Sequence, residues 1–210
     1  MIILSFYSHT LDGGDFVSLL YKEVDDFEAY AYHQKQFIGG NRYDRCVEAG
    51  CYPGKPWTLF FFYPADFTFV CPTELEDLQE KYQEFKKVNC EIYAISTDTH
   101  FAHKTWHDIS KNISKIEYPM IGDPTHTLTY DFDVFDENDG LAQRGSFIID
   151  PEGKIVVYEV NAGNVGRNAE ELLRRLHACQ FVYEHGNNVC PAKWKLGEKT
   201  IQTSIENVGK

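Results

Sequence analysis

A single cysteine stands at an unusual point of the sequence, between an apolar run and the start of a helical pattern. Cys71 ends the segment FFFYPADFTFVC and is followed by Pro72, which suits the first turn of a helix because its missing N–H has no partner there. We therefore expect Cys71 at the N-cap and Glu74 at the third helical position, so that C-P-T-E takes the place of a capping box. Free N–H groups and the positive end of the helix dipole would then face the sulfur and favour its thiolate form.

The same cysteine also has a plain structural interpretation, because an unpaired cysteine often behaves as a small buried hydrophobe. Its neighbours favour chemistry instead. Thr68 carries a hydroxyl that could hold a small polar substrate beside the sulfur, and Pro64, Phe67 and Phe69 are expected to shield that substrate from water. This combination predicts a nucleophilic thiol with a small substrate pocket.

Length and composition limit the classes of function. A chain of 210 residues, 43% hydrophobic and 15% aromatic, is long enough for one globular domain with its own core. Its formal net charge of −12 argues against nucleic acid or an anionic membrane as a partner, and no apolar run is long enough to span a bilayer. The start MIILSFYSHTLDGGD lacks the cationic region and long apolar stretch of a signal peptide, so a cytoplasmic, reducing location is expected.

Six cysteines in a reducing compartment are not expected to form a fixed disulfide framework. No two are spaced as C-x-x-C, and although eight histidines leave a metal site open by count, the usual zinc spacings are missing. We interpret Cys46 and Cys51 as unrelated loop thiols, and Cys90 and Cys179 as core thiols. No dinucleotide fingerprint is present, so neither flavin nor nicotinamide is expected to bind, and no cofactor or metal is assigned.

The elements that must position Cys71 alternate between strand and helix. Continuous apolar runs and a DPEG turn predict the strands, and apolar residues spaced by three and four predict the helices. The predicted strands cover residues 57–63, 90–96, 145–149 and 154–160, and the predicted helices cover 72–88, 99–113 and 169–183. This order favours one α/β domain with a central mixed sheet flanked by helices. We expect residues 1–24 to form a peripheral extension, 25–185 the domain and 186–210 a polar tail.

The segment around Cys71 also resembles a known family. YPADFTFVCPTEL is similar to the P-x-x-x-T-x-x-C signature of typical 2-Cys peroxiredoxins, and the flanking residues F-T-F-V-C-P-T-E match in full. The later segments GLAQRGSFIIDPEGKI, NVGRNAEELLRRL and EHGNNVCPAKWKLG resemble further segments of the family. The likeness extends from about residue 26 to residue 197. It implies a thioredoxin-like peroxiredoxin fold whose C-terminal tail carries a resolving cysteine.

By this resemblance Arg144 is the catalytic arginine and Arg167 is a second arginine of the site. The charges agree with that assignment, because a thiolate needs a nearby cation and Glu74, one turn away, would oppose it unless neutralised. Arg144 is therefore expected to face the thiolate and the peroxide, and Arg167 to pair with Glu74. Arginine suits both positions because it stays protonated and presents its donors in a fixed fork.

The implied reaction is displacement at the O–O bond of hydrogen peroxide or an organic hydroperoxide. Cys71 would attack one oxygen while Arg144 and Thr68 hold the peroxide, and the sulfenic acid on Cys71 would condense with Cys190 to a disulfide. In the family the resolving cysteine comes from the other subunit, which implies a homodimer, and similar proteins assemble into decameric rings. A dithiol reductase would restore the thiols, either an NADH-dependent flavoprotein disulfide reductase or thioredoxin.

Two other interpretations stay open from the sequence. A holdase chaperone or scaffold built from a stacked ring would keep its function after Cys71→Ser, whereas peroxide turnover would be lost. In a one-cysteine mechanism an external thiol would resolve Cys71, and Cys190→Ser would keep full turnover with a dithiol donor. The segment GGNRYDRCVEAGCYPGKPW is longer than the loop expected before the first core strand, and Cys46 and Cys51 within it match no family position.

Overall fold

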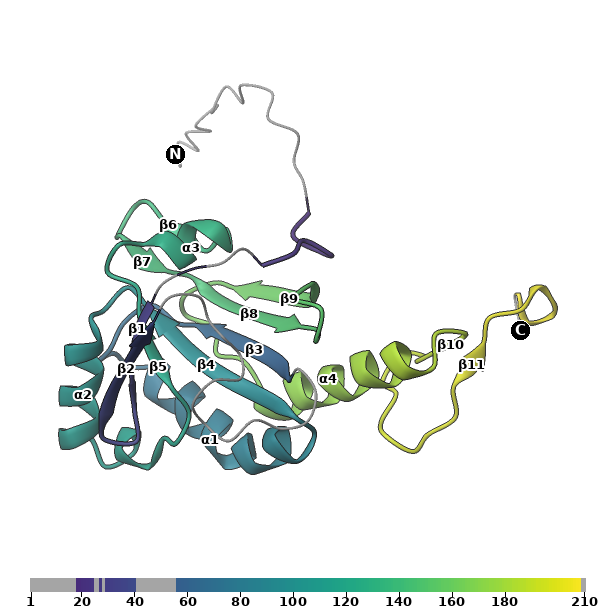
Figure 1. Ribbon diagram of the computed structural model, residues 1–210, viewed down its shortest axis with the longest axis horizontal. Helices are drawn as coiled ribbons and strands as arrows, with labels where there is room; N and C mark the ends of the chain where they lie inside the picture. The colour runs from purple at the N-terminus through teal and green to yellow at the C-terminus, as the bar shows by residue number, and fades with distance from the viewer. Residues whose placement is uncertain (1–17, 25–26, 28, 41–55, 209–210) are drawn as a thin grey trace, which may run out of the picture.

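The computed structural model describes residues 18–24, 27, 29–40 and 56–208, and its core is one mixed sheet of seven strands (Figure 1). The strand order is β2-β1-β5-β4-β3-β8-β9. In chain order the strands are β1 (Ala29–His33), β2 (Gln36–Gly40), β3 (Trp57–Phe62), β4 (Cys90–Ser96), β5 (Met120–Gly122), β8 (Arg144–Ile149) and β9 (Ile155–Asn161). β3 runs parallel to β4 and β4 parallel to β5, and the other pairs are antiparallel, so the predicted mixed sheet is confirmed.

Four α-helices in the described ranges cover the sheet, and the residues of β3 explain why they lie on both faces. Leu59 and Phe61 point into a cluster built with the helices below the sheet in Figure 1, while Phe60 and Phe62 point into a second cluster on the opposite face. The alternation follows from the two-residue period of a strand, and a strand buried on both faces reads as one continuous apolar run. The helices are α1 (Cys71–Lys87), α2 (His100–Ile109), α3 (Thr127–Asp131) and α4 (Ala169–Glu184).

Most of the predicted elements are present, with one clear difference in length. The strands from Trp57 and from Cys90, the hairpin β8–β9 and the helix α4 all lie where the patterns placed them. α2 ends at Ile109, because Ser110 is extended, and Ile113–Lys115 forms a separate 3₁₀ turn, so the predicted helix over 99–113 is too long. The sequence patterns did not predict the strands β1, β2 and β5 or the short helix α3.

Small elements complete the described chain. They are the paired strands β6 (Phe135–Asp136) and β7 (Leu141–Ala142), the paired strands β10 (Asn188–Val189) and β11 (Ile201–Gln202), and the 3₁₀ turn Ile205–Asn207. Before β1, Tyr21 and Lys22 exchange backbone hydrogen bonds with Ile155 of β9, at 2.7 and 3.0 Å. None of the helices in the described ranges has the length and apolar character needed to cross a bilayer. Cys46, Cys51 and most of the predicted extension lie outside the described residues.

The C-terminal end of α4 and the residues after it form an arm that projects from the body of the molecule (Figure 1). Trp194 fastens residues of the arm to the helix: it is almost fully buried, its backbone carbonyl accepts from Arg174 at 3.0 Å, and its ring packs on Phe181. Its indole N–H donates to the carbonyl of Glu198 at 3.0 Å. The part of the predicted tail around Trp194 therefore packs against α4, and the division of the chain at residues 24 and 185 stays a prediction.

Candidate active site

Cys71 is fully buried and is the first residue of α1, not its N-cap. The N-cap is Val70, whose backbone is already helical, with φ −83° and ψ −39°, and no side chain caps the helix. The carbonyl of Val70 accepts from the backbone N–H groups of Thr73 and Glu74 at 3.0 and 3.2 Å. The prediction of a sulfur-based capping box was therefore wrong by one residue. Cys71 and Pro72 occupy the first two helical positions, and the Glu74 side chain points to other partners.

Those partners are two buried arginines from other elements. Glu74 accepts from Arg144 Nη1 at 2.5 Å through Oε2. It also accepts from Arg167 Nε at 2.8 Å through Oε1 and from Arg167 Nη2 at 3.1 Å through Oε2, and the backbone N–H of Arg167 adds a bond of 2.9 Å. The side chains of all three residues are nearly inaccessible to water. Two cations thus surround one carboxylate, which leaves an excess of positive charge beside the first turn of α1.

Arg144 connects this cluster to the sulfur. Its Nη1 lies 3.4 Å from Cys71 Sγ, and its Nε donates to the carbonyl of Gly163 at 2.8 Å, so the guanidinium is held on two sides. The first position of β8 supplies Arg144, and the sheet pairs β8 with β3, the strand that leads into the loop before Cys71. A charged donor in contact with a buried sulfur stabilises the thiolate form.

Arg167 is fixed as firmly, and its hydrogen bonds go to groups other than the sulfur. Its Nη1 donates to the Gly145 carbonyl at 2.7 Å and to Ser146 Oγ at 3.1 Å, and its guanidinium carbon lies 3.4 Å from the centre of the Phe61 ring. Burial raises the pKa of Glu74, but the hydrogen bond and charge of Arg167 and the charge of Arg144 outweigh it, so the pKa is lowered overall. Glu74 is therefore ionised and neutralises one of the two arginines.

The loop before the cysteine differs from expectation in its aromatic residues. Thr68 is partly buried and its hydroxyl donates to the carbonyl of Ala65 at 2.8 Å. Phe69 is 95% exposed and Phe67 is 54% exposed, so the prediction that their rings shield the site from water was wrong. Phe67 stands at a turn, with a φ of 59° in the left-handed region, and its ring packs on Trp106 of α2.

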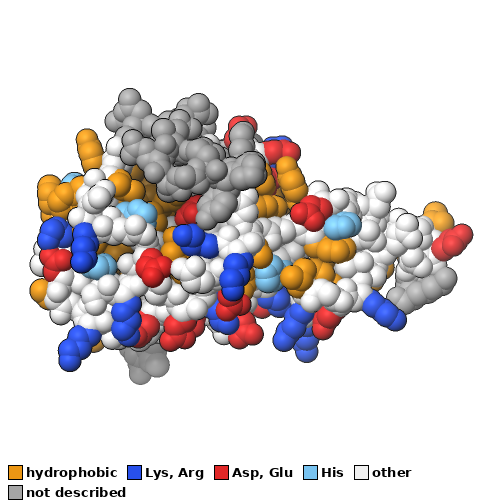
Figure 2. Space-filling model, turned by 60° about the horizontal axis from the view of Figure 1, so that its bottom comes forward, with side chains coloured by type: hydrophobic (Ala, Val, Ile, Leu, Met, Phe, Trp, Pro, Cys, Tyr) orange, Lys and Arg blue, Asp and Glu red, His pale blue; other side chains and the backbone are white. Residues whose placement is uncertain are grey.

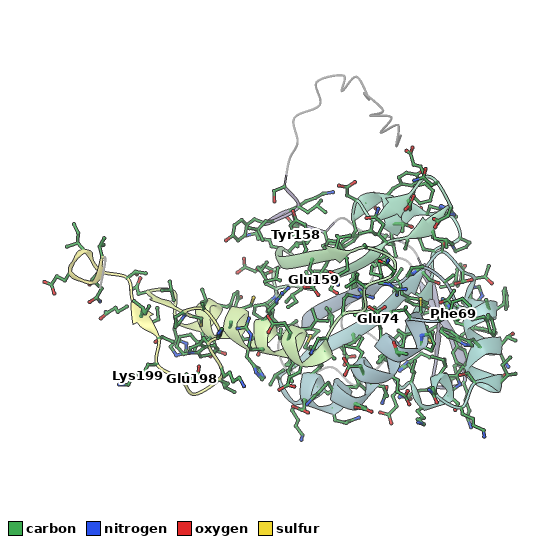
Figure 3. The ribbon with its side chains drawn as sticks, turned by 180° about the vertical axis from the view of Figure 1, so that it is seen from behind. Phe69, Glu74, Tyr158, Glu159, Glu198 and Lys199 are labelled. Carbon is green, nitrogen blue, oxygen red and sulfur yellow. The ribbon has the colours of Figure 1, made fainter. Side chains whose placement is uncertain are left out.

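The two predicted redox cysteines lie in different parts of the chain. Cys190 is on the arm, with Sγ 3.9 Å from the carbonyl of Ala178 in α4, while Cys71 is inside the body. Figure 3 shows Phe69 and Glu74, which flank Cys71 in sequence, in the body, and Glu198 and Lys199 on the arm at the opposite end of the molecule. The structure of one chain therefore does not bring the two sulfurs together.

The remaining described cysteines fit the interpretation of core thiols. Cys90 is buried and Cys179 packs against the same core cluster as α1. Burial raises the pKa of Cys90 well above the ordinary value, and it raises that of Cys179 to about 11, so neither is a good nucleophile at neutral pH. Burial also raises the pKa of Cys190, and the charge of Arg174 opposes the shift. No group of three or more His, Cys, Asp or Glu side chains in the described ranges could hold a metal ion.

Of the predicted site residues, the structure brings Cys71, Glu74, Arg144 and Arg167 into one bonded cluster. Pro64 and Thr68 belong to the loop that precedes it, and Cys190 is remote. Their catalytic roles stay predictions. The sequence patterns missed a buried polar group behind the loop, formed by Tyr63, Asp66 and His103; its only signal was an aspartate placed inside the P-x-x-x-T segment.

Comparisons with known proteins agree with this geometry. The model of the AhpC/TSA family matches residues 26–158, and that of the C-terminal domain of 1-Cys peroxiredoxin matches residues 178–209. Alkyl hydroperoxide reductase C of Bacillus subtilis (strain 168) is 52% identical over 194 residues, and that of Escherichia coli (strain K12) is 48% identical over 194 residues. Each alignment covers 92% of this chain and the whole of the relative.

Solved structures give the same result. The crystal structure of Enterococcus faecalis AhpC is 48% identical with a TM-score of 0.77, and the alignment covers 83% of this chain and all of the other. The reduced 2-Cys peroxiredoxin of Plasmodium vivax is 30% identical with a TM-score of 0.82, covering 90% of this chain and 96% of the other. The predicted fold class is thus confirmed.

Proposed function

Because the chain belongs to the AhpC/TSA family, as a 2-Cys peroxiredoxin of the AhpC type, we propose that it is a thiol-dependent peroxidase that reduces hydrogen peroxide and organic hydroperoxides in antioxidant defence. One observation supports this function above the others. The buried Sγ of Cys71 lies 3.4 Å from Arg144 Nη1, in a cluster that carries an excess of positive charge. This is the environment in which a thiol acts as a nucleophile.

The first step oxidises Cys71. Its thiolate attacks one oxygen of the peroxide, the S–O bond forms, and the O–O bond breaks. The second oxygen leaves with the bonding electron pair and takes up a proton, giving water or an alcohol, and Cys71 becomes a sulfenic acid. Arg144 donates toward the reacting atoms and stabilises the charge that moves onto the leaving oxygen, and the Thr68 hydroxyl and Pro64 shape the space for the peroxide.

The second step removes the sulfenic oxygen. The Cys190 thiol of a second copy condenses with the sulfenic acid, which forms a disulfide and releases water. The arm supports the involvement of a second copy, because it carries Cys190 away from its own Cys71 and exposes apolar side chains (Figure 2). Those with more than half of their surface exposed are Leu196, Ile205 and Val208. A homodimer in which each arm lies on its partner covers this apolar surface.

A larger assembly and a reductase complete the proposal. Exposed aromatic rings on and near α2, those of Phe67, Phe69 and Phe101, support a second interface, and we propose that dimers join through it into a decameric ring. The disulfide must be reduced after each turnover by a dithiol reductase, either an NADH-dependent flavoprotein disulfide reductase or thioredoxin. A cytoplasmic location fits this cycle, because the reducing compartment supplies the dithiol donor.

Peptide mass spectrometry under non-reducing conditions tests the cycle, after one equivalent of hydrogen peroxide is added to the reduced protein. A Cys71–Cys190 cross-link in a band of dimer mass on a denaturing gel is the expected result. Cys71 oxidised without a link would mean that an external thiol resolves it, as in a one-cysteine mechanism. A reduced Cys71 beside a Cys46–Cys51 link would overturn the assignment of the site. Cys190→Ser is the matched control, since it removes the cross-link without altering the first thiol.

A further inference from the structure

A buried polar cluster lies behind the loop that leads to Cys71, on the side of α2. His103 of α2 and the side chain of Asp66 have no exposed surface, and His103 Nδ1 lies 2.8 Å from Asp66 Oδ2. The other oxygen of Asp66 accepts from the Tyr63 hydroxyl at 2.8 Å. His103 Nε2 lies 3.1 Å from the carbonyl oxygen of Ile121 in β5. The mechanism above uses none of these groups.

The partners of His103 determine how many protons the cluster holds. The carbonyl of Ile121 can only accept, so Nε2 must carry a proton. Burial raises the pKa of Tyr63 well above its ordinary value, so its hydroxyl keeps its proton and donates to Asp66. A second proton must then lie in the bond between Nδ1 and Oδ2, because two unprotonated atoms would repel one another at 2.8 Å. The pair therefore holds two protons and has no net charge.

Asp66 connects this pair to the backbone of the loop, because its side chain is held by His103 and Tyr63 and its backbone by a third residue. The backbone N–H of Asp66 donates to Asp98 Oδ2 at 2.8 Å, and that oxygen also accepts from Ser96 Oγ at 2.7 Å. Asp66 is thus held by Asp98 in the loop after β4, by His103 of α2 and by Tyr63, the residue after β3. The residue before it, Ala65, accepts the hydroxyl of Thr68. The position of the Thr68 side chain thus depends on where Asp66 is held.

We propose that His103 is a positioning residue of the peroxidase site: with Asp66 it forms a buried pair that holds two protons and has no net charge, and this pair fixes the loop that carries Thr68 toward Cys71. The inference rests on the proposed function, since it assigns a role in peroxide reduction. His103 acts through Asp66 and does not touch the peroxide. A residue that only fills the core would contribute to stability and leave the reaction rate of the folded enzyme unchanged.

Two substitutions separate the contacts of His103. In His103→Asn the amide nitrogen takes approximately the place of Nδ1 and keeps a donor for Asp66, while the donor for Ile121 is lost. In His103→Gln the amide reaches approximately the place of Nε2, which keeps the donor for Ile121 and leaves Oδ2 of Asp66 without its donor. Both variants lose the ring and one hydrogen bond, so each is the control of the other for general damage to the core.

The rate constant for oxidation of Cys71 by hydrogen peroxide, followed by stopped-flow fluorescence, distinguishes these roles. We expect His103→Gln to be slower than wild type by about 10- to 100-fold, the effect of a misplaced catalytic group. The rate constant of His103→Asn should lie between those of wild type and His103→Gln. Thermal unfolding should show comparable losses of stability in both variants. Equal rates in folded wild type and His103→Gln would overturn the inference and leave the proposed function intact. A wild-type protein that does not react with peroxide would overturn the function itself.

The proton count has its own test, which is read from the wild-type protein and uses a variant only to assign the signal. In wild-type protein with ¹⁵N-labelled histidine, NMR should show one histidine with protons on both ring nitrogens at neutral pH, or with one ring nitrogen sharing its proton with a carboxylate. That signal should be missing from His103→Asn. A neutral ring with an unprotonated nitrogen that shares no proton would contradict the arrangement deduced from the contacts.

Discussion

Replacing Arg144 tests the site most directly, because one nitrogen of this side chain contacts both the sulfur and the neighbouring carboxylate. Nη1 lies 3.4 Å from Cys71 Sγ and 2.5 Å from Glu74 Oε2. Arg144→Gln removes the cation and the donor at the thiolate. A hydrogen bond to a charged group contributes about 1.5–3 kcal/mol. Since each 1.36 kcal/mol is a factor of ten in rate, oxidation of Cys71 should slow by roughly 10- to 150-fold.

Arg144→Lys refines the test, because lysine keeps the charge but loses the fork. Nε of Arg144 also donates to the Gly163 carbonyl at 2.8 Å, and one ammonium group cannot hold the positions of both nitrogens. The lysine variant should therefore react faster than the glutamine variant and more slowly than wild type. The measurement is the second-order rate constant with hydrogen peroxide, taken in a Cys190→Ser background so that only the first step is observed.

Arg175→Gln is the matched control for the loss of one arginine. Arg175 pairs with Glu159 and Glu171 on the polar side of α4, and its ion pairs do not involve the Cys71 cluster. Its removal should leave the rate of the first step at the wild-type value. If folded Arg144→Gln reacted as fast as this control, the contact between Arg144 and the sulfur would have no part in catalysis, and the reasoning from geometry would fail.

Three further substitutions test the framework that holds the site. Glu74→Gln should lower the free energy of unfolding by roughly 3–5 kcal/mol at neutral pH, because it breaks a buried ion pair. The pKa of Glu74 is lowered from 4.5 in the folded state, so the ionised side chain stabilises the fold fully above pH 4.5 and progressively less as the pH falls below it. The difference in free energy of unfolding between wild type and Glu74→Gln, measured with urea, should therefore narrow below pH 4.5 and stay constant above it. Leu78→Ala, at a fully buried position of α1, should cost about 2–5 kcal/mol in the same measurement. Asn168→Ala should cost about 0.5–2 kcal/mol, because the Asn168 side chain caps α4 by accepting from the Glu171 N–H at 3.0 Å.

The predictable part of the fold is the part whose residues are buried in a regular pattern. β3 is buried at every position and apolar at all but Thr58, and α4 repeats apolar residues at helical spacing, so the sequence pattern locates both. β1 was missed because its segment AYAYH is only half buried and because its two-residue turn to β2, formed by Gln34 and Lys35, lacks the glycine or asparagine typical of such turns. β5 was missed because three residues, Met120–Gly122, are too few to show a period.

Some features of the site could be predicted from neighbouring residues in the sequence, whereas others depend on contacts between distant residues. The Cys71 segment could be interpreted from its own residues, but the placement of Cys71 at the N-cap was wrong, because the backbone of Val70 is already helical and α1 begins one residue before Pro72. The contacts of Arg144 and Arg167 with Glu74 join residues 70 and 93 positions apart. Only the resemblance to a family pointed to them. The pairing of Asp66 with His103 had no such guide.

The burial of Cys71 places a condition on the second half of the cycle. Its sulfur has no exposed surface, and Thr73 and Glu74 bond the first turn of α1 to the carbonyl of Val70. A small peroxide needs only a narrow path to this sulfur, whereas a thiol on a protein chain needs room for a backbone. In the described conformation the Cys190 thiol of another subunit therefore cannot form a disulfide with Cys71 unless the first turn opens. The Val70 side chain makes no capping hydrogen bond, so this turn is held by backbone bonds and by the Thr73 hydroxyl, which donates to the Val70 carbonyl. The arginine cluster holds it through Glu74. The cluster that we propose to activate the sulfur thus also helps to hold the first turn closed.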